Sequence, residues 1–335
     1  KVRAGFRAFL GEDNADIALG ANTHELVLKF LSCLDFRRRP KLVTTDGEFH
    51  SARRQLARLA EEGIELERVP ARPVTTLAQR LAERIDGRTS AVMVSAVLFE
   101  TGQIVPHLDA LADACRARSV ELLVDAYHAL GPVPMNVGES GLTDAWITGG
   151  GYKYLQLGEG NAFLRLPAHA DDTRPVITGW FAEFGTMTEQ HRPDEVAYPA
   201  GADRFAGATY DPTSNFRAAK VFDFFAEHEL TPTFLHRVYQ HQIRFLADRF
   251  DDIGAPIEVI DRDRSVPLAN CGGFLALRSR YANRLRALLA ERGVAVDSRG
   301  DYLRLGPAPY LSDEQLAAAV QVLGEVLETP EFRAG

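Results

Sequence analysis

The feature that most constrains the fold is an alternation of short apolar segments with amphipathic helical patterns. The segments that read as strands are 41–45, 65–69, 91–98, 120–124, 144–148 and 162–166. The segments between them that read as helices are 50–62, 74–85 and a stretch that opens at Pro106, because their apolar residues recur at helical spacing. Strands that alternate with helices predict crossover connections and a parallel or mixed sheet.

The pattern changes after about residue 210. Long helical patterns cover 215–228 and 231–250, and strands at 273–277 and 302–305 alternate with helices at 281–292 and 312–327. We therefore expect an α/β protein with a large domain over 12–210, on a mainly parallel sheet, and a smaller α+β domain over 211–335. Residues 1–11 are expected to be a short or truncated leading segment. The aperiodic segment 182–206 is too long for an ordinary connection and is expected to be a functional loop.

Composition limits the classes of function. The 335 residues are 46% hydrophobic and 25% charged, as in ordinary globular proteins. A net charge of −8 argues against a nucleic-acid partner. No apolar run approaches the ~20 residues that span a membrane, and no signal peptide is visible, so we expect a cytoplasmic protein. The three cysteines and the spacing of the histidines predict neither a disulfide framework nor a metal site.

Residues with chemical potential collect where the predicted strands end, and ligands of open α/β sheets bind beyond those ends. Asp125 follows the strand 120–124, with His128 three residues later. The sequence GGGYKYL, which contains Lys153, follows the strand 144–148. Asp125 is equally interpretable as a cap, and GGGYKYL as a tight turn with an exposed lysine.

Two further segments extend this set. Ala21 and Asn22 lie at the start of a predicted helix, where free N–H groups and the helix dipole favour an anion; a plain N-cap is the alternative. Phe49 follows the strand 41–45 and is either a core residue or a stacking platform. A phosphate, an aromatic ring, a carboxylate and a lysine amine together suit pyridoxal 5′-phosphate. In this interpretation the glycines before Lys153 leave room for the cofactor ring.

The sequence resembles a known family along most of its length. The stretch VDAYHALGPVPMNVGESGLTDAWITGGGYKYLQLGEG resembles the Asp-to-Lys segment of class V, fold-type I pyridoxal phosphate enzymes, and is most similar to the kynureninase branch. FETGQIVPH, TGWFAEF and DYLRLGPAPY resemble further motifs of that branch. The resemblance implies the fold-type I transferase fold, with a seven-stranded-type sheet in the large domain.

The resemblance also implies roles for the matching residues. Lys153 would form the Schiff base, Asp125 would pair with the ring nitrogen with His128 close by, and Phe49 would stack on the ring. Arg304 would bind the substrate carboxylate, since a guanidinium matches a planar carboxylate. The phosphate would be held by Ala21, Asn22, Tyr152 and Trp180, and by Thr209 across a homodimer.

The expected activity is a kynureninase-like cleavage of a side-chain β-bond of an L-amino acid. The alternative is a class V aminotransferase or a β-lyase of the C–S lyase type, because the chain departs from the kynureninase branch at Ala52 and at Ala182–Glu183. A cysteine desulfurase is disfavoured, because such enzymes carry a nucleophilic cysteine shortly before the carboxylate-binding arginine and no cysteine lies between Cys271 and Arg304. A non-catalytic regulatory module that binds the cofactor is the remote alternative.

Overall fold

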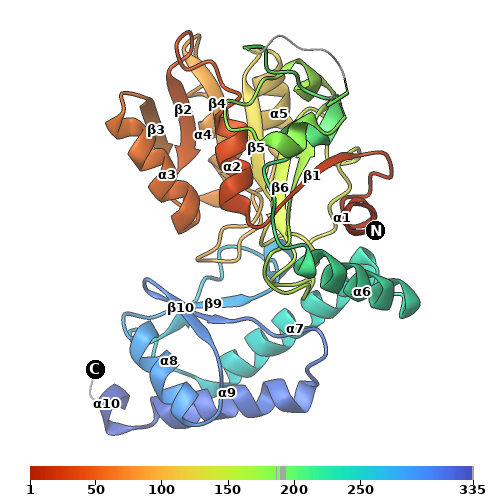
Figure 1. The fold of residues 1–335 in the computed structure, drawn as a ribbon. Helices are drawn as coiled ribbons and strands as arrows, with labels where there is room; N and C mark the ends of the chain where they lie inside the picture. Colours follow the sequence, from red (N-terminus) through yellow and green to blue (C-terminus); the bar gives the residue numbers. More distant parts are fainter. Residues whose placement is uncertain (186, 189–193, 334–335) are drawn as a thin grey trace. The chain divides into compact units, whose positions relative to one another are not determined.

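The structure is a computed structural model that describes residues 1–185, 187–188 and 194–333. The chain forms two compact units, each of which has its own sheet (Figure 1). The first unit contains residues 1–96, 105–130 and 134–231. The second contains residues 97–104, 131–133 and 232–335.

The first unit is built on a seven-stranded sheet of order β1-β7-β6-β5-β4-β2-β3. Its strands are β1 (Asp16–Gly20), β2 (Lys41–Thr45), β3 (Glu65–Val69), β4 (Thr89–Ser95), β5 (Glu121–Asp125), β6 (Trp146–Gly150) and β7 (Ala162–Leu166). The pairs among β3, β2, β4, β5 and β6 are parallel, whereas β7 is antiparallel to both β6 and β1. The predicted α/β class with a mainly parallel sheet is therefore confirmed.

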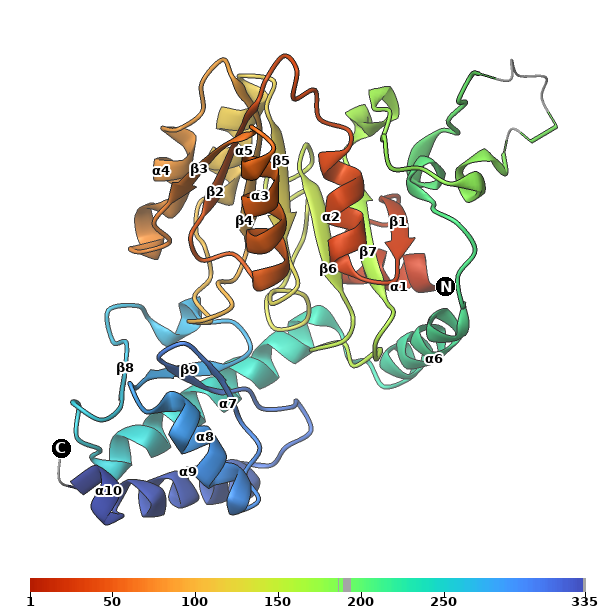
Figure 2. The same ribbon diagram turned by 60° about the vertical axis from the view of Figure 1, so that its left-hand side comes forward.

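Helices cover this sheet. They are α1 (Val2–Leu10), α2 (Thr23–Leu31), α3 (His50–Glu61), α4 (Leu77–Ala82), α5 (Leu108–Arg116) and α6 (Thr213–Glu227), with short 3-10 turns at Val74–Thr76, Ala168–Asp172, Trp180–Glu183 and Gly201–Phe205. Figure 2 shows α2 and α3 on one face of the sheet. Leu26 and Phe30 of α2, one helical turn apart, share a core with Leu56 of α3 and with Trp146 of β6.

The second unit has a four-stranded antiparallel sheet of order β10-β11-β9-β8. Its elements are α7 (Pro232–Ile253), β8 (Asp261–Arg262), a 3-10 turn (Leu268–Asn270), β9 (Leu275–Arg278), α8 (Ala282–Glu291), β10 (Asp297–Arg299), β11 (Tyr302–Leu305), α9 (Asp313–Leu327) and α10 (Pro330–Arg333). A single apolar core joins α7, α8 and α9 to β9 and β11.

The structure corrects the expected division of the chain. Helix α6 was expected in the second domain but belongs to the first unit, where the ring of Phe222 packs on Phe6 of α1 at 5.4 Å. Residues 2–10 form helix α1, which belongs to the first unit and is not a segment outside it. Part of the predicted loop 182–206 lies outside the described residues, and the rest includes the 3-10 turn Gly201–Phe205.

Candidate active site

The strand register brings the predicted site residues to one edge of the first unit's sheet. Gly20 ends β1 and pairs with Ala162 of β7, which also pairs with Gly150 at the end of β6. Because β7 is antiparallel to both, β1 and β6 point the same way and end at the same edge. Asp125 of β5 pairs with Thr148 of β6 at this edge. The segments that follow β1, β5 and β6 therefore start side by side.

Lys153 lies just beyond this edge, among three rings. Its Nζ is 2.6 Å from Nε2 of His128, a hydrogen bond in which the donor depends on the imidazole tautomer. The same amine is 5.7 Å from the ring centre of Phe49 and 5.6 Å from that of Tyr127. Phe49 is half-buried, so the structure favours a platform facing the amine over a core residue. A tight turn with an exposed lysine does not account for a half-buried amine that lies among three side-chain rings.

Asp125 is the carboxylate of the site. Its Oδ1 accepts a hydrogen bond from the backbone N–H of Tyr127 at 2.8 Å, so the cap interpretation describes a bond that is present. Burial raises the pKa of Asp125 to about 6, opposed by that hydrogen bond and by the charge of Lys153. A cationic partner would stabilise the ionised form of this carboxyl and would lower its pKa again.

The glycines 149–151 accommodate neighbouring side chains of the protein and not the cofactor ring. A Cβ at Gly149 would lie 2.9 Å from the ring of Phe163, and one at Gly150 would lie 2.5 Å from the ring of Tyr127. A Cβ at Gly151 would overlap the side chain of Leu157. The prediction that these glycines leave room for the cofactor ring is therefore wrong, because the space is filled by the protein's own side chains.

Asn22 is the N-cap of α2, as the simpler interpretation proposed. Its Oδ1 accepts from the backbone N–H of Glu25 at 2.9 Å, and its Nδ2 donates to the Glu25 carboxylate at 3.0 Å. Asn22 and Ala21 are both exposed. A cap bond uses the side chain and leaves the first backbone N–H groups of the helix in place, so a phosphate-binding role for this helix start stays a prediction.

Three other predicted cofactor residues lie on the surface of the first unit. Tyr152 is 51% exposed and Trp180 is 46% exposed. The backbone N–H of Phe181 donates to the carbonyl of Gly207 at 3.1 Å, which fixes the segment of Trp180 against the segment that leads to Thr209. Thr209 is exposed. The structure thus brings Trp180 and Thr209 into one neighbourhood, and their roles stay predictions.

Arg304, the predicted substrate residue, lies on β11 in the second unit. It is buried, and its guanidinium pairs with the carboxylate of Asp297 and donates to the carbonyl of Phe99. The guanidinium also lies 5.1 Å from the ring centre of Phe274. The Arg304 guanidinium is thus engaged in an ion pair with Asp297, whose side chain is partly exposed, and its substrate-binding role stays a prediction.

Sequence reasoning missed Glu48, the residue before Phe49. Glu48 is buried, with hydrogen bonds from the hydroxyls of Thr45 at 2.7 Å and Ser95 at 2.6 Å. Its burial, with a smaller contribution from the nearby charge of Asp125, raises its pKa to about 7. The available signal was an acidic residue three positions after the strand 41–45 and directly before Phe49.

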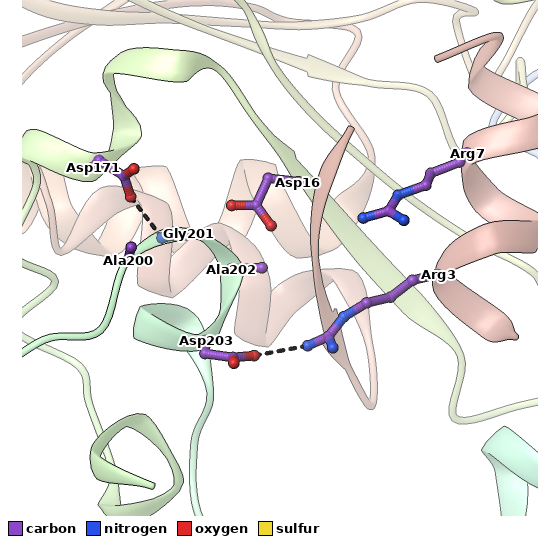
Figure 3. A pocket seen from close by; sticks show the side chains of 8 residues that line it. All are labelled: Arg3, Arg7, Asp16, Asp171, Ala200, Gly201, Ala202 and Asp203. Carbon is purple, nitrogen blue, oxygen red and sulfur yellow. Dashed lines mark hydrogen bonds and ion pairs between the residues drawn. The ribbon is translucent and has the colours of Figure 1, made fainter. Parts of the chain in front are cut away.

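Figure 3 shows a charged pocket of about 400 Å³ elsewhere in the first unit. It is lined by Arg3, Arg7, Asp16, Asp171 and residues 200–203. Arg3 donates to Asp203 at 3.0 Å, between two of the lining residues. Asp16 begins β1, so the pocket lies at the opposite end of that strand from the edge that carries Lys153.

Within residues 1–185, 187–188 and 194–333, no helix is long and apolar enough to cross a membrane. The same residues contain no cluster of histidine, cysteine and acidic side chains that could hold a metal ion.

Comparison with known proteins connects this site to a family. Residues 1–153, the segment that ends at Lys153, match the family Aminotransferase class-V. The chain is 22% identical over 325 residues to the uncharacterized aminotransferase YcbU of Bacillus subtilis (strain 168), and the match covers 95% of this chain and 81% of YcbU. It is 28% identical over 189 residues to the cysteine desulfurase IscS of Rickettsia typhi, covering 55% of this chain and 45% of that enzyme.

The whole fold matches solved structures of the cystine C–S lyase C-DES. Its complex with the reaction product cysteine persulfide matches with a TM-score of 0.83 at 18% identity, covering 97% of this chain and 85% of that one. A C-DES mutant with glycine covalently linked to the pyridoxal phosphate cofactor matches with a TM-score of 0.82. The fold is therefore the fold-type I pyridoxal phosphate transferase fold, and the first part of the chain has the sequence features of class-V aminotransferases. These findings give no support to the kynureninase branch.

Proposed function

We propose that this protein is a pyridoxal phosphate-dependent lyase that eliminates the β-substituent of an L-amino acid, with a carbon–sulfur bond as the best-supported target. The observation that carries the proposal is the part-buried amine of Lys153, 2.6 Å from His128 at the sheet edge that also carries Asp125. The cofactor is pyridoxal 5′-phosphate, which the family match and the fold support.

The residues of the site fit this cofactor. Bound pyridoxal phosphate supplies an electron-withdrawing ring that stabilises negative charge on the substrate's α-carbon. Lys153 holds the cofactor and provides an amine that takes a proton from the α-carbon. His128, in hydrogen-bond contact with that amine, accepts the proton from it or returns it. Asp125 would be the counter-charge for the ring nitrogen, and Phe49 would face the ring.

The state of the cysteines supports a lyase over a desulfurase. Burial raises the pKa of the Cys33 and Cys115 thiols to about 12, and that of Cys271 to about 11. A thiolate rather than a thiol is the nucleophile, so these cysteines are poor acceptors of sulfur. A β-elimination needs no enzyme thiol: the substrate and one water give pyruvate, ammonium and the free thiol of the leaving group.

We also propose that the working enzyme is a homodimer. Exposed aromatic side chains gather around the predicted partner-facing residue Thr209: Trp180, Phe184 and Tyr210 are 46%, 55% and 55% exposed. The rings of Trp180 and Phe184 lie 4.6 Å apart, so these two exposed rings form one apolar surface. Patches of this kind mark association surfaces. Sedimentation of a fully active monomer would contradict this proposal.

The test is product analysis of the purified, cofactor-loaded enzyme with a panel of amino acids that contains L-cystine, L-cysteine and L-kynurenine. A C–S lyase releases pyruvate and ammonium from a sulfur amino acid without a second keto acid. A requirement for a keto acid would instead support an aminotransferase, and release of alanine from kynurenine would restore the kynureninase-like reaction. The variant Lys153→Ala is the control, because it should be inactive with every substrate.

A further inference from the structure

The carboxyl of Glu48 has no part in the proposed chemistry, yet it is bonded on both oxygens at the sheet edge of the site. Its Oε1 accepts from the Thr45 hydroxyl at 2.7 Å and from the Ser95 backbone N–H at 3.2 Å. Its Oε2 shares a hydrogen bond of 2.6 Å with the Ser95 hydroxyl. Thr45 ends β2 and Ser95 ends β4, so this one side chain ties the loop after β2 to the end of β4.

The hydrogen bonds of Glu48 connect two parts of the candidate site, the loop before Phe49 and the strand next to Asp125. Phe49, the predicted ring platform, directly follows Glu48. It is the N-cap of α3 and so lies at the end of the same loop. Ser95 pairs with Asp125 in the strand register, and the backbone N–H of Ala96 donates to the Asp125 carbonyl at 2.8 Å. Glu48 therefore connects the residue before the platform to the strand that neighbours the predicted counter-charge.

The carboxyls of Glu48 and Asp125 also interact electrostatically. The charged group of the described residues that acts on Glu48 is Asp125, and the charge that acts on Asp125 is that of Lys153. The other partners of Glu48 are hydroxyls and an amide. Two carboxyls that interact in this way do not both ionise readily, and Glu48, at 4% exposed, is the more buried of the two, since Asp125 is only half-buried. Asp125 has the charge of Lys153 nearby and is partly open to solvent, whereas Glu48 is buried among hydroxyls and an amide, so the proton of the pair belongs on Glu48.

We propose that Glu48 is a positioning residue that acts as a neutral, protonated acid: it fixes the Phe49 loop to β4 and leaves Asp125 as the ionised carboxyl of the site. The effect on catalysis rests on the proposed function. The protonation state does not, because it can be measured on the protein without cofactor. The two parts can therefore fail separately.

The experiment compares Glu48→Gln, which imitates the neutral acid, with Glu48→Ala, which removes the tie. Glu62→Gln, at the exposed end of α3, is the control for loss of a carboxyl. We expect Glu48→Gln to keep kcat and KM within about threefold of wild type near pH 6.5, whereas Glu48→Ala loses at least about tenfold in kcat/KM. Equal losses in both variants would show that the ionised carboxylate is needed and would overturn the proposal.

A second readout needs no activity. The pKa of Glu48 is about 7 in the folded protein, above its ordinary value of about 4.3 in an unfolded chain. Between about pH 4.3 and pH 7 Glu48 thus keeps its proton in the folded state but loses it in the unfolded chain. The free energy of unfolding therefore falls as the pH rises through this window. We expect the urea midpoint of the cofactor-free wild-type protein to fall more steeply from pH 5 to pH 8 than that of Glu48→Gln. The same slope in both would show that Glu48 is ionised throughout and would refute its role as a neutral acid.

Discussion

Gly150→Ala tests the finding that the glycine run accommodates protein side chains. The added Cβ would lie 2.5 Å from Cε2 of Tyr127 and 3.0 Å from the carbonyl oxygen of Asn161. The second neighbour is backbone next to the β7 strand, so the Tyr127 ring is the group that must move. Adding one methyl group to a well-packed site costs about 1–3 kcal/mol in the free energy of unfolding. We expect a loss in this range.

The displaced ring also affects the site, because its centre lies 5.6 Å from the Lys153 amine. The assay is urea unfolding of the cofactor-free protein, followed by the visible spectrum after cofactor is added. Gly87→Ala is the matched control, since no atom lies within 4 Å of its Cβ position and the residue is exposed. It should change the free energy of unfolding by no more than about 0.5 kcal/mol.

A double-mutant cycle assigns the cost to the ring. In a Tyr127→Ala background, Gly150→Ala should be less destabilising by about 0.5–3 kcal/mol than in the wild type, because the clashing atoms are gone. An unchanged cost in that background, or a Gly150→Ala protein as stable as wild type, would refute the packing argument.

Three further predictions concern chemistry and pH. Arg304→Lys should lower kcat/KM by roughly 30- to 1,000-fold without changing cofactor loading, because lysine cannot form the paired contacts to a carboxylate; unchanged kinetics would leave Arg304 as a partner of Asp297 only. Replacing Cys33, Cys115 and Cys271 together with alanine should leave lyase turnover intact, whereas loss of turnover with normal cofactor loading would support a desulfurase. The raised pKa of Glu48 should make the stability of the cofactor-free wild type relative to Glu48→Gln about 3 kcal/mol lower at pH 8 than at pH 4.5, at about 1.4 kcal/mol per pKa unit. A relative stability that rises over this interval would contradict the assignment.

Much of the fold was predictable because short segments with apolar residues alternate with helical patterns along the chain. The segments 41–45, 65–69, 162–166 and 302–305 are strands with the predicted bounds. Strand β1 was not predicted, since DIALG at an edge of the sheet has little of the β-branched character that marks a strand. Strands β8 and β10 have two and three residues, too few to show any periodicity.

The site was predictable as a set of strand ends but not in its contacts. The order of elements places Asp125 and Lys153 at one edge, because parallel strands end together. Sequence could not show that Tyr127 fills the space above Gly150, which depends on the rotamer of a ring 23 positions earlier. Glu48 was equally hidden, because its partner Ser95 is 47 residues away.

The central claim is that Lys153 is the residue that bonds covalently to the cofactor, and borohydride reduction of the cofactor-loaded enzyme tests it most directly. Peptide mapping of the reduced protein should find the cofactor on Lys153, and Lys153→Ala should carry none. Reduced cofactor on Lys41 or Lys220, or no covalent cofactor on the wild-type protein, would contradict the account.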